Sequence, residues 1–173
     1  MAGSLILIQE TTLSTPTATV VLTGIDSTFD VYKVSVSNVQ PVTDNKNLQL
    51  RVTKSGTAQS DSEYDSAGKN LQTSGSFGNS SGSNATSVTF AFSLGNQTNE
   101  TANAILYLFN FANAEYSFIT SESNFLNGTP SLVGFQGGHV HTVASASDGV
   151  SFEMESSVNI NTGASFKLYG LVK

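Results

Sequence analysis

Apolar and polar residues alternate with a period of two along much of the chain. In the clearest segment, residues 29–39, the apolar side chains of Tyr32, Val34 and Val36 are separated by polar ones such as Ser35. Successive side chains of a strand point to opposite faces of a sheet, so this period indicates a strand with one buried face. Alternation or a short apolar run predicts strands at 4–10, 17–23, 29–39, 48–53, 88–93, 104–111, 116–119, 132–142, 150–154 and 166–172.

Two of these segments are apolar at nearly every position instead of alternating. Residues 4–10 contain the run LILI directly after Ser4, and residues 104–111 contain the run ILYLF. A continuous apolar run indicates a strand that is covered on both sides. We therefore expect residues 104–111 to be buried on both faces, and residues 4–10 to be buried on both faces or paired with another chain.

Residues 55–85 differ from the rest of the chain. They are mostly Ser, Gly, Asn, Asp and Gln, and Tyr64, Leu71 and Phe77 are their only large apolar residues. Polar clusters of this kind predict loops. Loops of this length are usually functional or disordered. We expect a long polar excursion over the surface at about 55–85, with at most short strands.

The number and spacing of the strands predict an all-β fold. No segment shows helical periodicity over three turns, and no repeat of fixed period is visible. Roughly eight to ten short strands with turn residues between them are the pattern of a sandwich or a jelly roll. We expect one domain over residues 1–173, a jelly-roll-like antiparallel β-sandwich with long polar loops. A plain antiparallel sandwich is the alternative.

Composition and charge exclude several classes of partner. The chain has 26 Ser, 19 Thr and 15 Asn among 173 residues, and seven Lys or Arg against thirteen Asp or Glu give a net charge of −6. We expect no nucleic-acid partner, because that affinity comes mainly from cations along the phosphates. We expect no membrane partner either, since the charge disfavours anionic lipid and no apolar run reaches the roughly 20 residues of a membrane helix. Without cysteine, disulfides and thiolate sites are excluded.

The two histidines are the first candidates for chemistry. His139 and His141 are two residues apart, so on a strand they point to the same face, where two imidazoles could share a metal ion. Zinc would need at least a third ligand from elsewhere in the chain. We favour the alternative, a half-exposed strand face or a column of stacked rings in a symmetric oligomer.

Three carboxylates form the second candidate site. Asp61, Glu63 and Asp65 occupy alternate positions, and calcium prefers several carboxylate oxygens. The segment lacks the glycine and the closing acid of a calcium loop, so we favour a solvated acidic loop. No nucleophile elbow, phosphate-binding loop or dinucleotide fingerprint occurs. The sequence therefore predicts no catalytic residue and no cofactor, with these histidines and acids as weak metal candidates only.

The two ends of the chain carry a recognisable pattern. It comprises LILIQET at 5–11, FDVYKV at 29–34 followed by LQLRV at 48–52, and GASFKLYGL at 163–171, with an acidic Tyr64-Asp65 loop between. In these segments the chain resembles a family of virion proteins of tailed bacteriophages, in which such strands frame one jelly-roll-like domain. The chain departs from that pattern in having Phe29 as the first aromatic residue and Leu171 in place of the usual Ile.

The resemblance implies a non-enzymatic structural protein of the virion, assembled in the host cytoplasm. Such domains decorate capsids as cement proteins on the outer shell, which is the function we expect. They also occur at the ends of tail fibres, so the alternative is a tail-fibre or knob module that binds cell-surface glycan. The implied partners are the major capsid protein or other virion subunits, and further copies of this chain, with a trimer as the expected homo-oligomer.

The apolar terminal strands bear on this expectation. An exposed apolar edge strand is an aggregation risk on a free monomer. We therefore expect the first strand to pair with the last strand, of the same or of a neighbouring subunit. The candidate residues for this edge or for contacts between subunits are Leu5, Ile6, Leu7, Ile8, Leu168, Tyr169 and Leu171.

Overall fold

The computed structural model describes residues 4–172, which form thirteen strands and one short 3-10 helix, η1 Glu155–Ser157. No helix within these residues is long and apolar enough to cross a membrane. The strands are β1 Leu5–Thr12, β2 Thr19–Thr23, β3 Val31–Val39, β4 Lys46–Lys54, β5 Thr57–Ala58, β6 Tyr64–Gln72, β7 Phe77–Ala85, β8 Val88–Leu94, β9 Ala102–Phe109, β10 Ser117–Leu126, β11 Leu132–His141, β12 Gly149–Met154 and β13 Ser165–Leu171.

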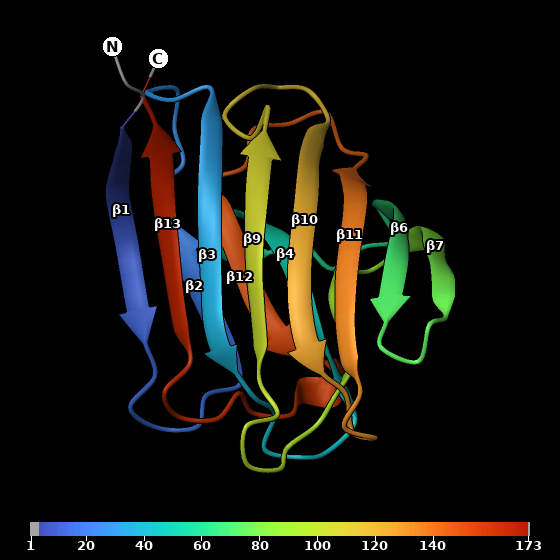
Figure 1. The fold of residues 1–173 in the computed structure, drawn as a ribbon. Helices are drawn as coiled ribbons and strands as arrows, with labels where there is room; N and C mark the ends of the chain where they lie inside the picture. The colour runs from blue at the N-terminus through green and yellow to red at the C-terminus, as the bar shows by residue number, and fades with distance from the viewer. Residues whose placement is uncertain (1–3, 173) are drawn as a thin grey trace.

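The strands form two antiparallel sheets that pack face to face. One sheet has eight strands in the order β1-β13-β3-β9-β10-β11-β6-β7, and the other has the order β2-β12-β4-β5, with β8 also pairing with β4. Figure 1 shows the eight-stranded sheet in front and the second sheet behind it. The predicted all-β antiparallel sandwich is therefore confirmed.

The strand pairing follows the scheme of a jelly roll. When β5 to β7 and β10 to β11 are set aside as insertions, eight strands remain. The first of these pairs with the last (β1 with β13), the second with the seventh (β2 with β12), the third with the sixth (β3 with β9) and the fourth with the fifth (β4 with β8). A long antiparallel hairpin rolled up into two sheets has these pairings. Of the inserted strands, β6, β7, β10 and β11 widen the eight-stranded sheet, whereas β5 pairs with β4 in the other sheet.

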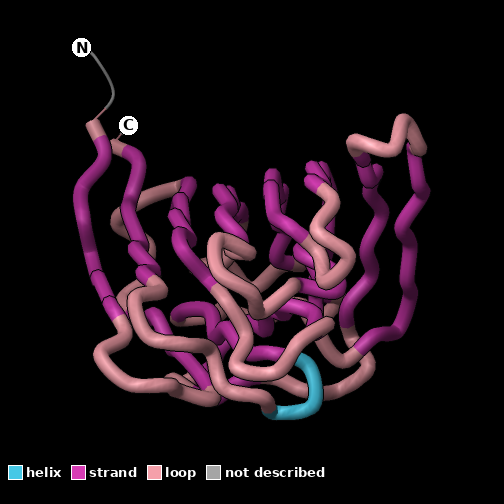
Figure 2. The backbone as a smooth tube through the Cα atoms, turned by 60° about the horizontal axis from the view of Figure 1, so that its bottom comes forward, coloured by secondary structure: helices cyan, strands magenta, loops and turns pink. Residues whose placement is uncertain are grey.

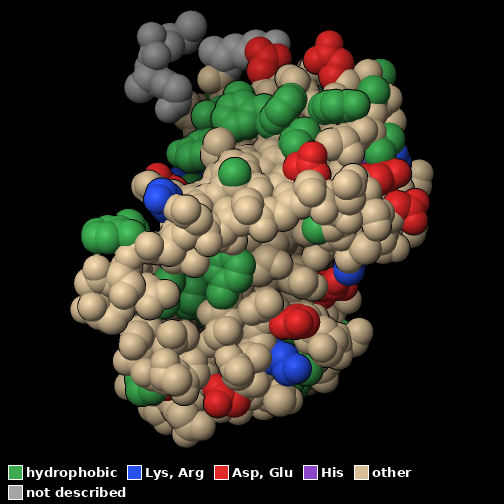
Figure 3. All heavy atoms as spheres, turned by 90° about the vertical axis from the view of Figure 1, so that its right-hand side faces the viewer, with side chains coloured by type: hydrophobic (Ala, Val, Ile, Leu, Met, Phe, Trp, Pro, Cys, Tyr) green, Lys and Arg blue, Asp and Glu red, His purple; other side chains and the backbone are tan. Residues whose placement is uncertain are grey.

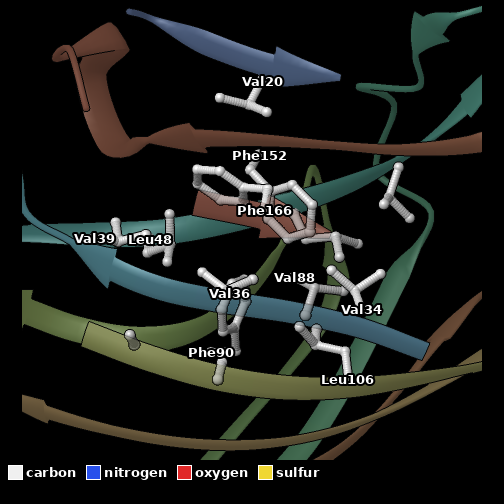
Figure 4. Packing of buried hydrophobic residues seen from close by; sticks show 14 of the residues in the cluster. Val20, Val34, Val36, Val39, Leu48, Val88, Phe90, Leu106, Phe152 and Phe166 are labelled. Atoms are coloured by element: carbon white, nitrogen blue, oxygen red, sulfur yellow. The ribbon is translucent and has the colours of Figure 1, made fainter. Parts of the chain in front are cut away.

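One cluster of buried hydrophobic residues fills the space between the sheets. At its centre the rings of Phe152 in β12 and Phe166 in β13 lie 5.0 Å apart, measured between centroids. Phe90 of β8 meets Phe152 edge to face at 6.1 Å. Figure 4 shows valines and leucines of both sheets around these rings. Because β12 and β13 belong to different sheets, the two rings join the layers.

The prediction of a polar loop with at most short strands at 55–85 is wrong. This segment contains β5 and two nine-residue strands, β6 and β7, which form a hairpin, and β6 pairs along its whole length with β11. A strand needs backbone partners, which any residue except proline supplies. The hairpin lies at the margin of the wide sheet, where β7 has no apolar core to cover, so its sequence is polar.

The prediction that residues 104–111 are buried on both faces is also wrong, and of the two alternatives for residues 4–10 the structure excludes burial on both faces within this chain. In β9, Ile105 and Tyr107 are exposed on the face turned away from the second sheet. In β1, the first three residues are exposed although they point alternately to both faces. Both strands belong to the eight-stranded sheet, and the five-stranded sheet covers only one side of it. These apolar side chains therefore lie on the surface of the protein.

Candidate functional site

The two terminal strands lie side by side, as the sequence predicted. β1 pairs antiparallel with β13, with Leu5 opposite Leu171 and Leu7 opposite Tyr169. On its other side β1 has no strand partner among residues 4–172, so it is an edge of the eight-stranded sheet. Leu5, Ile6 and Leu7 are 47%, 47% and 49% exposed. The pairing therefore covers one side of β1 and leaves an apolar edge open.

Two of the seven predicted edge residues point inward. Leu168 is fully buried in the core, and Ile8 packs against the core. The prediction of a contact with another subunit is wrong for Leu168, because alternation along β13 turns this position toward the second sheet. Tyr169 and Leu171, on either side of Gly170, face away from it.

A glutamine fixes the edge strand to the second sheet. At the β-bulge that follows Leu7, Gln9 Nε2 donates to the carbonyl of Val21 at 3.2 Å, and Gln9 Oε1 accepts from the backbone N–H of Thr23 at 2.7 Å. One side chain thus satisfies two backbone groups of β2. The edge is held in place without burying the leucines before the bulge.

Apolar residues continue from β1 across the outer face of the eight-stranded sheet, where Phe118 is exposed and Val31, Phe109 and Val140 are partly exposed. Cross-strand pairing places Val31 opposite Phe109, Phe109 opposite Phe118, and Phe118 opposite Val140. This line lies at the end of the sheet that carries the chain termini, and Figure 3 shows hydrophobic side chains gathered near that end. A contiguous apolar patch on a protein surface is a candidate interaction site. We call it the apolar row: Leu5, Leu171, Val31, Phe109, Phe118 and Val140.

The middle of the same outer face is hollowed. Figure 2 shows the two margins of the sheet, β1 and the β6–β7 hairpin, rising on either side of the central strands. Two adjoining hollows, of about 750 and 440 Å³, lie here and share Ile105, Glu122 and Gln136. Together they form one trough across β3, β9, β10, β11 and β6. Its main polar and aromatic side chains are Ser35, Lys69, Tyr107, Glu122, Asn124 and Gln136.

The two charged groups of the trough have neutral amide partners. Gln136 Nε2 donates to Glu122 Oε1 at 3.2 Å, and Lys69 Nζ donates to Asn79 Oδ1 at 2.6 Å. One acid and one base leave the trough without a net charge. Its remaining polar lining consists of hydroxyl and amide groups, which can both donate and accept hydrogen bonds.

His139 lies on the same face of β11 as His141, as the spacing predicted, but this face is the buried one. The expectation of a half-exposed face is therefore wrong. His139 Nε2 lies 2.8 Å from Ser121 Oγ, and its Nδ1 lies 2.9 Å from Ser66 Oγ. A neutral imidazole has one donor and one acceptor nitrogen, and hydroxyls can match both. Burial lowers the pKa of His139 to about 4, so the ring is neutral at pH 7.

His141 has a single polar partner. Its Nε2 donates to Glu63 Oε2 at 3.3 Å, its ring lies 4.9 Å from that of Tyr64, and its buried Nδ1 has no hydrogen-bond partner. Burial lowers the pKa of His141, and the carboxylate of Glu63 opposes this shift. In the part of the chain that the structure describes, no three His, Asp or Glu side chains come together as a metal site.

The three acids of the second metal candidate point to different partners. Glu63 contacts His141, Asp65 Oδ1 accepts from the backbone N–H of Asn84 at 2.8 Å, and Asp61 is exposed. The backbone N–H of Glu63 also donates to the carbonyl of Asp61 at 2.8 Å. This turn breaks the strand alternation on which the prediction depended, so the three carboxylates do not share one face.

The trough was not predicted from the sequence. Its lining comes from five strands that are distant in the sequence, and each contributes the residues of its outward face, which are polar in most of these strands and include Ile105 and Tyr107 in β9. Such a pattern predicts a solvent-facing surface, but not that the surface is hollowed. The signal that was present is the glycine-rich character of 134–138 and the polar character of 65–70, which together form one side of the trough.

Comparison with known proteins supplies no relative. No family model, curated protein or solved structure matches the chain. The resemblance to phage virion proteins thus remains a hypothesis from the sequence pattern, and the functional argument depends on the surfaces described above.

Proposed function

We propose that the protein is a non-enzymatic structural subunit of a tailed-phage virion, a decoration or cement protein that binds the outer shell. The observation that supports this proposal is the apolar row, together with the open edge of β1. An apolar surface that continues into an unpaired strand edge is a surface for another protein. The partners are the major capsid protein or other virion subunits, and further copies of this chain, with a trimer as the proposed homo-oligomer. Contacts repeated by symmetry would add avidity.

Attachment through the apolar row is expected to depend little on salt. The row contains no charged residue, and Lys167, four residues from Leu171 in β13, is paired with Glu10 Oε1 at 2.9 Å. Screening at high ionic strength weakens contacts between charges but not apolar contacts. Washing decorated particles in about 1 M salt should leave the protein bound, as measured by gel densitometry of sedimented particles. Release of most copies would contradict this mechanism.

A single charge in the apolar row is expected to prevent attachment. Phe118→Lys places an ammonium group in the middle of the row, and we expect about tenfold less protein bound to particles that lack it, because the charge must be desolvated on contact. The measurement is cosedimentation with particles over a range of protein concentrations. Far-UV circular dichroism checks that the variant is folded.

Phe77→Lys is the matched control for this substitution. Phe77 is 74% exposed on the same outer face, but it lies on β7 at the opposite margin of the sheet and outside the apolar row. This variant should bind particles as the unmodified protein does. Equal binding by both variants would contradict the proposal, and so would equal loss by both.

The second candidate function is a receptor-binding module of a tail fibre or knob. It is favoured by the trough, whose neutral polar lining suits a glycan. The number of copies in a virion distinguishes the two locations: hundreds of copies indicate capsid decoration, whereas a few to a few dozen indicate a fibre or tail. Quantitative mass spectrometry of purified particles measures this number.

A further inference from the structure

A lane of small side chains crosses the trough beside Tyr107. Cross-strand pairing places Tyr107 opposite Thr120, Thr120 opposite Gly138, and Gly138 opposite Ala67. A Cβ atom added to Gly138 would meet no other atom within 4 Å, so the space above this part of the sheet is open. The lane therefore has a floor of small groups, with the half-exposed ring of Tyr107 on β9 as its one aromatic residue.

A row of hydrogen-bonding side chains runs parallel to this lane. Glu122 lies opposite Gln136, and Gln136 lies opposite Lys69. Each of these residues follows or precedes the lane residue of its strand by two positions, a separation of about 6.7 Å. The lane crosses four strands, so its three spacings give it a length of about 14 Å, and the row crosses three strands, so its two spacings give it a length of about 9.5 Å. The amide pair of Asn103 and Asn124, joined at 3.4 Å, extends the polar side.

The lane and the parallel row of polar side chains match the two kinds of surface on a sugar chain. A pyranose ring has an apolar face, which stacks on aromatic and small apolar groups, and a rim of hydroxyls, which planar amides and carboxylates bind. Because Glu122 and Lys69 cancel each other, the trough favours neither a polyanion nor a polycation. The chain's net charge of −6 disfavours a polyanion further.

We propose that the trough binds an uncharged linear oligosaccharide that lies along the lane from β9 to β6. Tyr107 contacts the apolar face of one sugar ring, and Glu122, Gln136 and Lys69 bind hydroxyl groups. This inference rests on the second candidate function and deepens it by naming the class of glycan, and it does not depend on attachment through the apolar row. It assigns a separate function to the centre of the face that carries the apolar row at its end.

The test is direct binding of glycans by the isolated protein. A glycan array with both uncharged and charged probes identifies the best probe, and isothermal titration calorimetry of that probe measures its affinity. We expect an uncharged linear probe to bind with a Kd of about 10⁻³ to 10⁻⁵ M. Binding to charged probes alone, or to none, would overturn the proposal.

Two variants test the location of the site. Tyr107→Ala removes the aromatic ring, and Gly138→Leu fills the open space above the lane without meeting a neighbouring atom at its Cβ. Each should weaken binding at least tenfold while thermal unfolding stays near that of the unmodified protein. Tyr116→Ala is the matched control, because Tyr116 is also exposed, at 46% against 36% for Tyr107, but lies outside the trough. Unchanged binding by Tyr107→Ala, or equal loss in Tyr116→Ala, would overturn the assignment.

Two further measurements separate this proposal from other uses of the face. Sedimentation velocity of the unmodified protein and of Gly138→Leu shows whether the trough is instead covered by a second copy; dissociation of an oligomer by this variant would overturn the glycan site. Leu5→Lys, in the part of the apolar row that lies on β1 and outside the trough, should retain glycan binding while losing attachment to particles. The proposal of glycan binding and the proposal of attachment to particles can therefore fail independently of each other.

Discussion

Replacing Phe152 with alanine is expected to lower the free energy of unfolding by about 3–5 kcal/mol, the usual range for truncation of a buried aromatic ring. Phe152 is fully buried, and its ring contacts that of Phe166 from the opposite sheet and that of Phe90 from its own. The truncation leaves a cavity at the point where the two layers meet. Urea unfolding followed by far-UV circular dichroism measures the loss, as a lower midpoint with an unchanged slope.

The same truncation on the outer face supplies the control. Phe118 is 47% exposed, so Phe118→Ala removes the same atoms from a surface position. Its free energy of unfolding should change by no more than about 0.5 kcal/mol. If Phe118→Ala destabilised the protein as much as Phe152→Ala, the assignment of inner and outer faces in the eight-stranded sheet would be wrong.

The faces of most strands were predictable from the sequence because one side of each touches a single core. Val34 and Val36 alternate with polar residues in β3, and they are buried as that pattern predicts. The pairing of the terminal strands was also predictable, because each of two apolar strands at the ends of one chain can supply a backbone partner for the other. The order of the remaining strands was not predictable, because it depends on contacts that are distant in the sequence.

The β6–β7 hairpin escaped prediction for a physical reason. At Gly68 of β6, a Cβ atom would lie 2.4 Å from the ring of Phe135 in β11, so the glycine is what allows this ring to pack across the strand. The strand β6 leaves room for a side chain of its neighbour and pairs with the neighbour's backbone. Neither role requires a hydrophobic period, so periodicity cannot detect such a strand. Hydrophobic periodicity does not predict the trough for the same reason, because β6 forms one side of it.

The buried state of His139 also depends on this hairpin. Its Nδ1 partner, Ser66, belongs to β6, and its Nε2 partner, Ser121, belongs to β10. The serine hydroxyls and the imidazole satisfy one another's hydrogen-bonding capacity inside the protein. Residues whose polarity predicts a surface position therefore form a buried cluster. Such a cluster favours the neutral ring, because a charged imidazolium would be poorly solvated there.

Acidification from pH 7 to about 4.5 is expected to remove about 2 kcal/mol of stability through His139 alone. The pKa of this histidine is 6.5 in the unfolded chain and about 4 in the folded protein, where burial lowers it. Between these values the unfolded state binds the additional proton, so stability falls as the pH falls. The contribution is fully present above pH 6.5 and is lost progressively toward pH 4. Urea unfolding at a series of pH values measures it.

His139→Gln isolates this contribution from other titrating groups. The amide of glutamine can donate to one serine hydroxyl and accept from the other, but it takes up no proton. The other titratable groups are the same in both proteins, so their effects cancel when the two pH profiles are subtracted. The difference should be flat above pH 6.5 and should change by about 2 kcal/mol by pH 4.5, in favour of the variant. Parallel profiles over this range would show that His139 is not held neutral by its burial between Ser66 and Ser121.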